Sequence, residues 1–126
     1  MAKVFLDANI LIDLVEKRSP VTIKKLDGYN LFISPLSLHI LMYIMRQKIP
    51  YEKLSNIINH FFLIPFEDDI AYKSLNGPTK DFEDNVQLHS AAQANCDLFL
   101  TNDEKLLGLR FFGKVQLSPL PTLPLS

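Results

Sequence analysis

Three acidic residues stand where the chain passes from one expected element to another. Asp7 and Asp103 each come soon after a short apolar run, at residues 4–6 and 98–100, and Asp84 lies just inside a segment of helical character. If both runs are strands of one parallel sheet, their carboxyl ends meet at the edge where open α/β folds bind ligands. Clustered carboxylates repel one another unless a cation joins them, and such hard oxygen ligands suit Mg²⁺ or Mn²⁺.

Each of these acids also has a purely structural interpretation. Asp7 or Asn9 could cap the first helix, and Asp103 could cap the short helix that follows it. Asp81 could cap a third helix, with Asp84 three residues later at nearly the spacing of a capping box. A cap alone would accept Ser or Thr, whereas a metal site needs carboxylates. The residues by themselves therefore leave capping and metal binding open.

Short strands that alternate with longer helices are expected to position these acids. Strands are predicted at 3–6, 31–33, 97–100 and 115–117, with an extended piece at 63–66. Helical spacing predicts helices from Asn9 to a break at Ser19-Pro20, around 24–25, and at 36–48, 51–62, 67–75, 82–95 and 103–107. This alternation is typical of a three-layer α/β/α sandwich around a short, mostly parallel sheet.

The composition limits the classes of protein that the chain can belong to. A length of 126 residues, 48% of them hydrophobic, predicts one domain, which we place at 1–117, with a tail at 118–126 that holds three of the eight prolines. The single cysteine, Cys96, excludes an intramolecular disulfide and fits the reducing cytoplasm. Lys3 is followed at once by a strand, so no secretory signal is expected, and no apolar stretch approaches the roughly 20 residues of a membrane span.

The acidic segments are similar to those of the PIN domain family, metal-dependent ribonucleases that include the toxins of many bacterial toxin–antitoxin pairs. The similar segments are residues 4–13, 33–38 and 81–103, in family order. The D-x-N beginning at Asp7 has little specificity. The D-F-x-D segment from Asp81, followed at this interval by D-x-x-x-T-x-D from Asp97, is much more specific.

The resemblance implies a PIN-like fold and hydrolysis of RNA phosphodiester bonds with Mg²⁺ or Mn²⁺. It implies that Asp7, Asp84 and Asp103 are catalytic metal ligands and that Asp81 is an additional candidate ligand. It also implies that Thr101 supplies a supporting hydroxyl beside Asp103, and that Asn9 orients Asp7 by a hydrogen bond. In a two-metal version the ions would lie about 3.5–4 Å apart.

One position departs from the family pattern. Many members carry a glutamate in the helix after the second strand, where this chain has Ile40. Fewer carboxylates would bind metal more weakly and favour one ion over two. His39 could compensate as a ligand or acid, although a lone histidine beside an apolar face is more often structural, and Asp13 is typical of a surface residue. The alternatives are a PIN-like module that binds RNA or protein without cutting, and a phosphatase or DNA nuclease on the same acids.

The expected partners are an RNA substrate, an antitoxin that covers the acidic groove, and a second copy of the chain. The net charge of −1 does not indicate a polyanion binder, but a bound divalent cation changes the local sign. Seven cations are candidates for phosphate contact, although charged runs are usually solvated surface: Lys17, Arg18, Lys24, Lys25, Arg46, Lys48 and Lys80. The mean hydropathy of +0.10 and the apolar helix at 38–45 hint at a dimer or partner surface, with core packing as the simpler interpretation.

Overall fold

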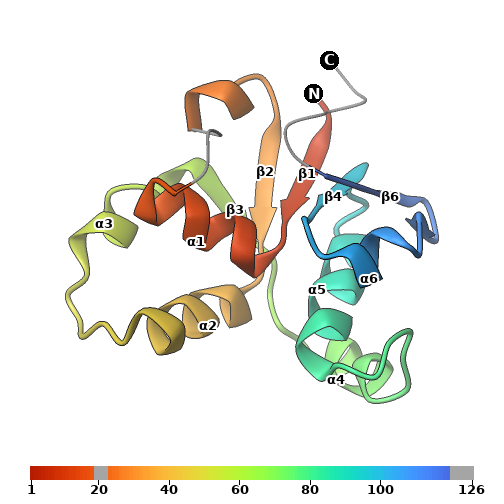
Figure 1. Ribbon diagram of the computed structural model, residues 1–126. Coiled ribbons are helices and arrows are strands. Elements are labelled where there is room, and N and C mark those ends of the chain that lie inside the picture. Colours follow the sequence, from red (N-terminus) through yellow and green to blue (C-terminus); the bar gives the residue numbers. More distant parts are fainter. Residues whose placement is uncertain (19–22, 120–126) are drawn as a thin grey trace.

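The computed structural model describes residues 1–18 and 23–119, and these form one mixed sheet with helices on both sides (Figure 1). The strands follow the order β3-β2-β1-β4-β6-β5. All neighbours are parallel except β5 and β6. The strands are β1 (Lys3–Leu6), β2 (Asn30–Ile33), β3 (Phe61–Leu63), β4 (Leu98–Leu100), β5 (Phe111–Phe112) and β6 (Val115–Ser118).

Helices connect the parallel strands, as the sequence predicts for a parallel sheet, whereas β5 and β6 are joined by a turn. In the described residues they are α1 (Ala8–Glu16), the 3₁₀ turn η1 (Ile23–Leu26), α2 (Pro35–Met45), α3 (Glu52–Ser55), the 3₁₀ turn η2 (Ile58–His60), α4 (Asp68–Ser74), α5 (Phe82–Gln93) and α6 (Glu104–Leu107). None of them is long and apolar enough to cross a membrane.

The alternation of side chains along each strand divides the core into two layers. Val4 and Leu6 pack in one apolar cluster with α1, whereas Phe5 packs in the other with Leu88 of α5. Phe5 also stacks on Phe99 of β4, with ring centroids 5.1 Å apart. Helices α1 to α3 lie on one side of the sheet and α4 to α6 on the other (Figure 1). The three-layer α/β/α sandwich expected from the sequence is confirmed.

The helix predicted at 51–62 is wrong. Only Glu52–Ser55 and the turn Ile58–His60 are helical, and the chain then enters β3 at Phe61. Phe61 pairs with Leu31 of β2 and is buried, while Phe62 stacks on Phe32 with centroids 5.1 Å apart. The apolar residues fit a helical spacing, but pairing with the open edge of β2 and the cross-strand aromatic contact favour a strand.

The C-terminal region differs from the prediction in two details. The short strand β5 was not expected, because two residues carry almost no periodic signal. Strand β6 ends at Ser118, which pairs with Leu100, so it extends one residue beyond the strand predicted at 115–117. Residues 120–126 of the expected tail, and the expected break at Ser19-Pro20, lie outside the described residues.

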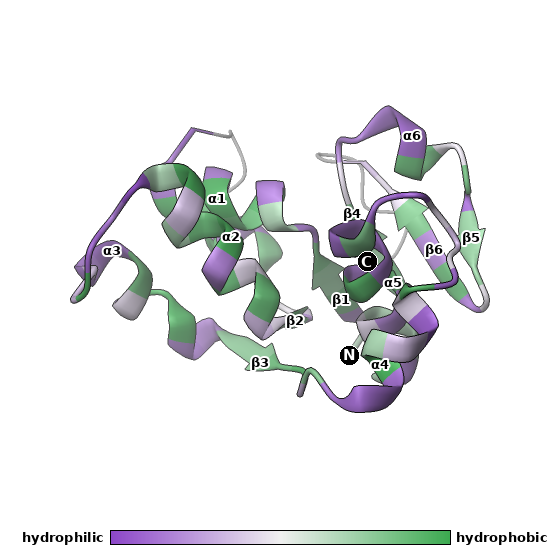
Figure 2. Cartoon of the chain, turned by 90° about the horizontal axis from the view of Figure 1, so that it is seen from below, coloured by the Kyte–Doolittle hydropathy of each residue, from purple (hydrophilic) through white to green (hydrophobic). Residues whose placement is uncertain are grey.

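The carboxyl ends of β1 and β2 point down in Figure 1, and Figure 2 views the molecule from that side. Hydrophobic segments are visible on α2 in this view, whereas the chain is hydrophilic where it enters α4 (Figure 2). The acidic residues singled out in the sequence follow the strands or open the helices on this side of the sheet.

Candidate functional site

The register of β1 and β4 brings Asp7 beside Thr101. Leu6 is paired with Leu100, and the backbone N–H of Asp7 donates to the Leu100 carbonyl at 3.0 Å. Asp7 occupies the N-cap position of α1, yet its side chain makes no capping hydrogen bond. Its side chain is 4% exposed. Asp7 is thus a buried carboxylate that helix capping does not explain, and the expectation that Asn9 is the cap is wrong because α1 starts at Ala8.

Thr101 links two of the acids. Its hydroxyl donates to Oδ2 of Asp7 at 2.6 Å and accepts the backbone N–H of Asp103 at 3.0 Å. Thr101 is itself fully buried. The family resemblance implies a supporting role for Thr101 beside Asp103. In the structure its hydroxyl also hydrogen-bonds Asp7. Asn9 is exposed in the first turn of α1, and within the described residues it makes no hydrogen bond to Asp7.

Gln87 is a further residue at this site that sequence reasoning missed. It is 2% exposed on α5, and its Oε1 accepts the backbone N–H of Ala8 at 2.8 Å. Its side chain also lowers the pKa of Asp7 by hydrogen bonding. A long polar side chain between Val86 and Leu88 on a buried helix, one turn after Asp84, was the available signal.

The acids share one electrostatic environment although they are far apart in sequence. Burial raises the pKa of Asp7, and the charge of Asp103 adds to that effect, while the hydroxyl of Thr101 opposes it. The pKa of half-buried Asp84 is raised to about 6, first by burial and then by Asp81, Asp7 and Asp103. Every charged group that shifts the pKa of Asp84 is itself a carboxylate. Among the described residues, the charges that shift the pKa values of Asp7 and Asp84 are therefore all negative.

Two of the acids do cap helices. Oδ1 of Asp81 accepts the backbone N–H of Asp84 at 3.0 Å at the start of α5. Oδ1 of Asp103 accepts the backbone N–H of Lys105 at 2.8 Å at the start of α6. These bonds account for one oxygen of each carboxylate. The structural interpretation thus holds for Asp81 and Asp103, while Asp7 and Asp84 are the acids that it leaves unexplained.

A buried asparagine fixes the loop that leads to Asp81. Oδ1 of Asn85 accepts both the N–H and the hydroxyl of Thr79, at 2.8 and 2.7 Å. Its amide donates to the carbonyls of Ser74 and Thr79, at 2.8 and 2.9 Å. Because Asn85 satisfies four bonds at once, it holds the α4–α5 connection and the start of α5 as one unit.

The oxygen atoms of these carboxylates are ligands of the type that a hard divalent cation prefers. All candidates offer carboxylate oxygen, which Mg²⁺ and Mn²⁺ prefer. Among residues 1–18 and 23–119, no three acidic, histidine or cysteine side chains stand close enough to form a ready-made metal site. Like charges without a counter-charge repel, so some spreading of these carboxylates is expected on physical grounds. Ile40, at the expected acidic position, is 9% exposed, and His39 is exposed on α2 with its ring stacked on Tyr43.

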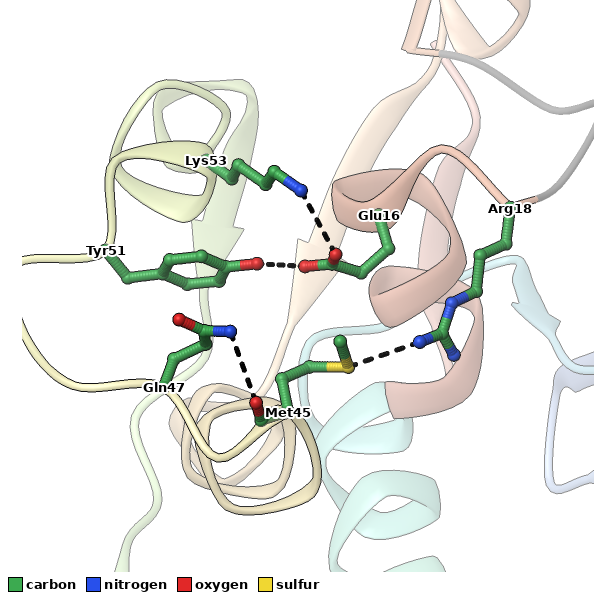
Figure 3. Close-up of polar contacts among 6 residues, drawn as sticks. All are labelled: Glu16, Arg18, Met45, Gln47, Tyr51 and Lys53. Atoms are coloured by element: carbon green, nitrogen blue, oxygen red, sulfur yellow. Dashed lines mark hydrogen bonds and ion pairs between the residues drawn. The ribbon is translucent and has the colours of Figure 1, made fainter.

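Of the candidate RNA-contacting cations, Lys80 adjoins the acidic residues in the sequence, and the others belong to other parts of the fold. Lys80 directly precedes Asp81 and so lies at the acidic edge. Lys17 follows the last turn of α1, ten residues after Asp7 and about 15 Å away along the helix. Arg46 and Lys48 follow α2, and Arg18 reaches Sδ of Met45 at the end of that helix, at 3.5 Å (Figure 3). Lys24 and Lys25 belong to η1.

The same end of α1 carries a polar network that is separate from the acidic edge. Tyr51 donates its hydroxyl to Glu16, and Lys53 forms an ion pair with Glu16 at 3.3 Å (Figure 3). The hydrogen bond from Tyr51 lowers the pKa of Glu16. These contacts join α1 to the segment that begins α3, and none of the acids of the candidate site takes part in them.

Comparisons with known proteins bear on the family and the fold of this chain. The sequence matches the PIN domain family over residues 3–105, from β1 into α6. The fold is similar to that of a chain in the crystal structure of VapBC2 from Rickettsia felis bound to a DNA fragment from their promoter. The TM-score is 0.70 at 17% sequence identity, over 93% of this chain and 98% of that one. No curated protein sequence matches significantly. PIN domains are generally nucleases that depend on a divalent metal. Because the family match covers most of the sequence, this chain belongs to the PIN domain family.

Proposed function

We propose that this protein is a metal-dependent endoribonuclease of the cytoplasm and the toxin of a toxin–antitoxin pair. The observation that carries the proposal is the environment of Asp7. A buried carboxylate with a pKa raised by burial and by the charge of Asp103 is unfavourable for folding, and Asp7, held by Thr101, is not used as a cap. Buried carboxylates whose pKa is raised, and whose burial stability does not explain, are typical of functional sites.

The proposed roles follow from the contacts. Asp7, Asp84 and Asp103 would hold Mg²⁺ or Mn²⁺, with Asp81 at the rim of the site. Thr101 holds Oδ2 of Asp7, so the carboxylate would be presented to the ion in a set orientation. An ion held there would supply a water of lowered pKa and would offset charge on the phosphate. The chain then needs no nucleophile of its own, and the Thr101 hydroxyl, already donated to Asp7, does not serve as one.

The toxin role rests on family membership and on the structural likeness to VapBC2. An antitoxin chain would cover the acidic edge and the exposed apolar side chains near it, such as Tyr43 and Phe82, which are 71% and 41% exposed. A second copy of the chain is an alternative occupant for the exposed residues of the edge strand β3, Phe62 and Leu63.

Ile40 favours a second candidate function. An isoleucine in place of a carboxylate removes a ligand, and a chain with too few ligands would keep the PIN fold while binding RNA or protein without cutting. The two functions differ in one observable, because a binding module retains its affinity for RNA when metal is removed, whereas an enzyme loses its reaction.

The deciding experiment is cleavage of single-stranded RNA by purified protein with Mg²⁺ or Mn²⁺, and with EDTA. Asp84→Asn removes a proposed ligand. Asp68→Asn is a matched control, because Asp68 is also an acid in the first turn of a helix but is exposed on α4. We expect cleavage by the wild type and by Asp68→Asn, and loss of cleavage with EDTA and in Asp84→Asn. Equal cleavage by both variants would overturn the assignment of the site.

A further inference from the structure

A groove separates α2 from the first turn of α5 beside the acidic site. Its volume is about 320 Å³, and it is lined by His39, Ile40, Tyr43, Ile44 and Glu83. Glu83 directly precedes Asp84, so the groove opens next to the acid whose pKa is raised to about 6. Figure 2 views the molecule from the side of the carboxyl ends of β1 and β2, and hydrophobic segments of α2 are visible there.

The α2 wall of the groove offers flat, exposed rings. The side chain of Tyr43 is 71% exposed, and His39 beside it is exposed as well. Their rings are 6.4 Å apart between centroids and lie within 21° of parallel. Ile44 adds an apolar surface that is 53% exposed. Aromatic faces presented in this way are the platforms on which unpaired bases stack in single-stranded nucleic acids.

The charge of the groove selects against phosphate and in favour of a base. Of the residues that line it, Glu83 is the one with a carboxylate, and none is a lysine or arginine. Ile40, buried at 9% exposure, adds an apolar surface where a carboxylate would add a second negative charge. A phosphate group would be repelled here, whereas a neutral base would be covered on its faces. A carboxylate accepts hydrogen bonds from amino groups such as the N4 amino group of cytosine.

We propose that this groove binds one unpaired base of the RNA strand next to the phosphate held at the acids, with Tyr43 stacking on the base and Glu83 accepting from its amino group. The assignment deepens the proposed ribonuclease function and rests on it. Bases with an exocyclic amino group, such as cytosine, are favoured over uracil, which offers carbonyl oxygens at the same edge and would meet the Glu83 carboxylate with like partial charge.

The test measures binding separately from cleavage. Fluorescence anisotropy gives the Kd of labelled eight-nucleotide oligo(rC) and oligo(rU) for the Asp84→Asn protein in Mg²⁺, so that no strand is cut. We expect tighter binding of oligo(rC) than of oligo(rU). When Tyr43→Ala is combined with Asp84→Asn, the affinity for both oligonucleotides should fall about tenfold, the size of one lost stacking contact. Tyr43→Phe in the same background should retain the affinity, and Glu83→Gln should remove the preference for oligo(rC).

Tyr72→Ala is the matched control, because Tyr72 is 68% exposed on α4, away from the groove. It should leave both Kd values unchanged. Unchanged affinity in Tyr43→Ala would overturn the proposal. So would a Tyr43→Ala protein that binds RNA normally but sediments as a smaller species, because the groove would then be a protein interface. Base-dependent binding together with a wild type that does not cut RNA would support the groove and refute the enzyme, so the two failures are distinguishable.

Discussion

Thr101 donates its hydroxyl to Asp7 across two neighbouring strands, at 2.6 Å, and both residues are buried. The two residues are 94 positions apart in the chain. They meet because β1 and β4 are parallel neighbours whose registers end together at Leu6 and Leu100. The carboxyl ends of these strands therefore hold one acid in a fixed orientation, and the same hydroxyl accepts the N–H of Asp103.

Thr101→Val tests that relationship with almost no change of shape. It leaves a buried carboxylate oxygen without its donor, which should lower the free energy of unfolding by about 1–3 kcal/mol. RNA cleavage should fall about 10- to 100-fold, the usual effect of removing a group that orients a ligand. Thr101→Ser keeps the hydroxyl and should keep most of the activity. Cleavage by Thr101→Val at the wild-type rate would show that this hydrogen bond does not orient the site.

Asp84 should destabilise the metal-free protein at neutral pH. Its pKa is raised from 3.8 to about 6, so its charged form is disfavoured in the folded state. The destabilisation is absent below the unfolded pKa, grows as the pH rises between about 4 and 6, and is complete above the folded pKa. The free energy of unfolding of Asp84→Asn should therefore be about 1 kcal/mol higher than that of the wild type at pH 7.5 in EDTA. This value allows for solvent screening of a half-buried group.

The gain from Asp84→Asn should disappear as the pH falls toward 4, which denaturant unfolding at several pH values would measure. Added Mn²⁺ should stabilise the wild type more than the variant, because binding to the folded state alone raises stability. A variant less stable than the wild type at pH 7.5 without metal would contradict the electrostatic account of the site.

Asn85→Ala should loosen the connection that leads to Asp81. It removes four hydrogen bonds and leaves buried backbone groups unpaired, with an expected loss of about 2–3 kcal/mol in the free energy of unfolding. Asn76→Ala provides the comparison, because Asn76 is exposed and donates one bond, to Tyr72. Hydrogen exchange of residues 75–81 should accelerate in Asn85→Ala and not in Asn76→Ala. Equal exchange in the two variants would show that the loop is held by other contacts.

Tyr51→Phe should affect stability without affecting cleavage. The tyrosine donates to Glu16 and lowers its pKa from 4.5, so this contribution is present above pH 4.5 and is lost as the pH falls through the lowered value. We expect a loss of about 1 kcal/mol at pH 7, where the hydrogen bond to a charged group is partly exposed. A change in cleavage rate at saturating RNA would mean that the far end of α1 is coupled to the acidic edge.

The sequence alone predicted the sheet edge at which the acids lie, but it did not predict the hydrogen bonds that hold them there. Two apolar runs, each followed by an acid, predicted that Asp7 and Asp103 meet, because parallel strands end at one edge. The bond between Thr101 and Asp7 depends on the exact register of β1 against β4, which no local pattern encodes. Gln87 was missed because a polar residue on a buried helix face carries no periodic signal. Asn9 was assigned a role that its exposed position in the structure does not support.

The expected helix at 51–62 failed for a related reason. Phe61 and Phe62 continue a helical spacing, but the open edge of β2 offers backbone pairing and a ring to stack on. Tertiary context then overrides the local pattern. Ile40 was recognised as a departure from the family, while its place in a groove with Tyr43 and Glu83 emerges only from the packing of α2 against α5.

The most direct test of the central claim is the rate of single-stranded RNA cleavage as a function of Mn²⁺ concentration, for the wild type and Asp7→Asn. Asp7 is the buried acid that capping leaves unexplained. A wild-type rate that rises to saturation with Mn²⁺, beside an Asp7→Asn protein that folds but does not cut at any concentration, is the predicted result. A folded Asp7→Asn protein with the wild-type dependence on Mn²⁺ would contradict the account.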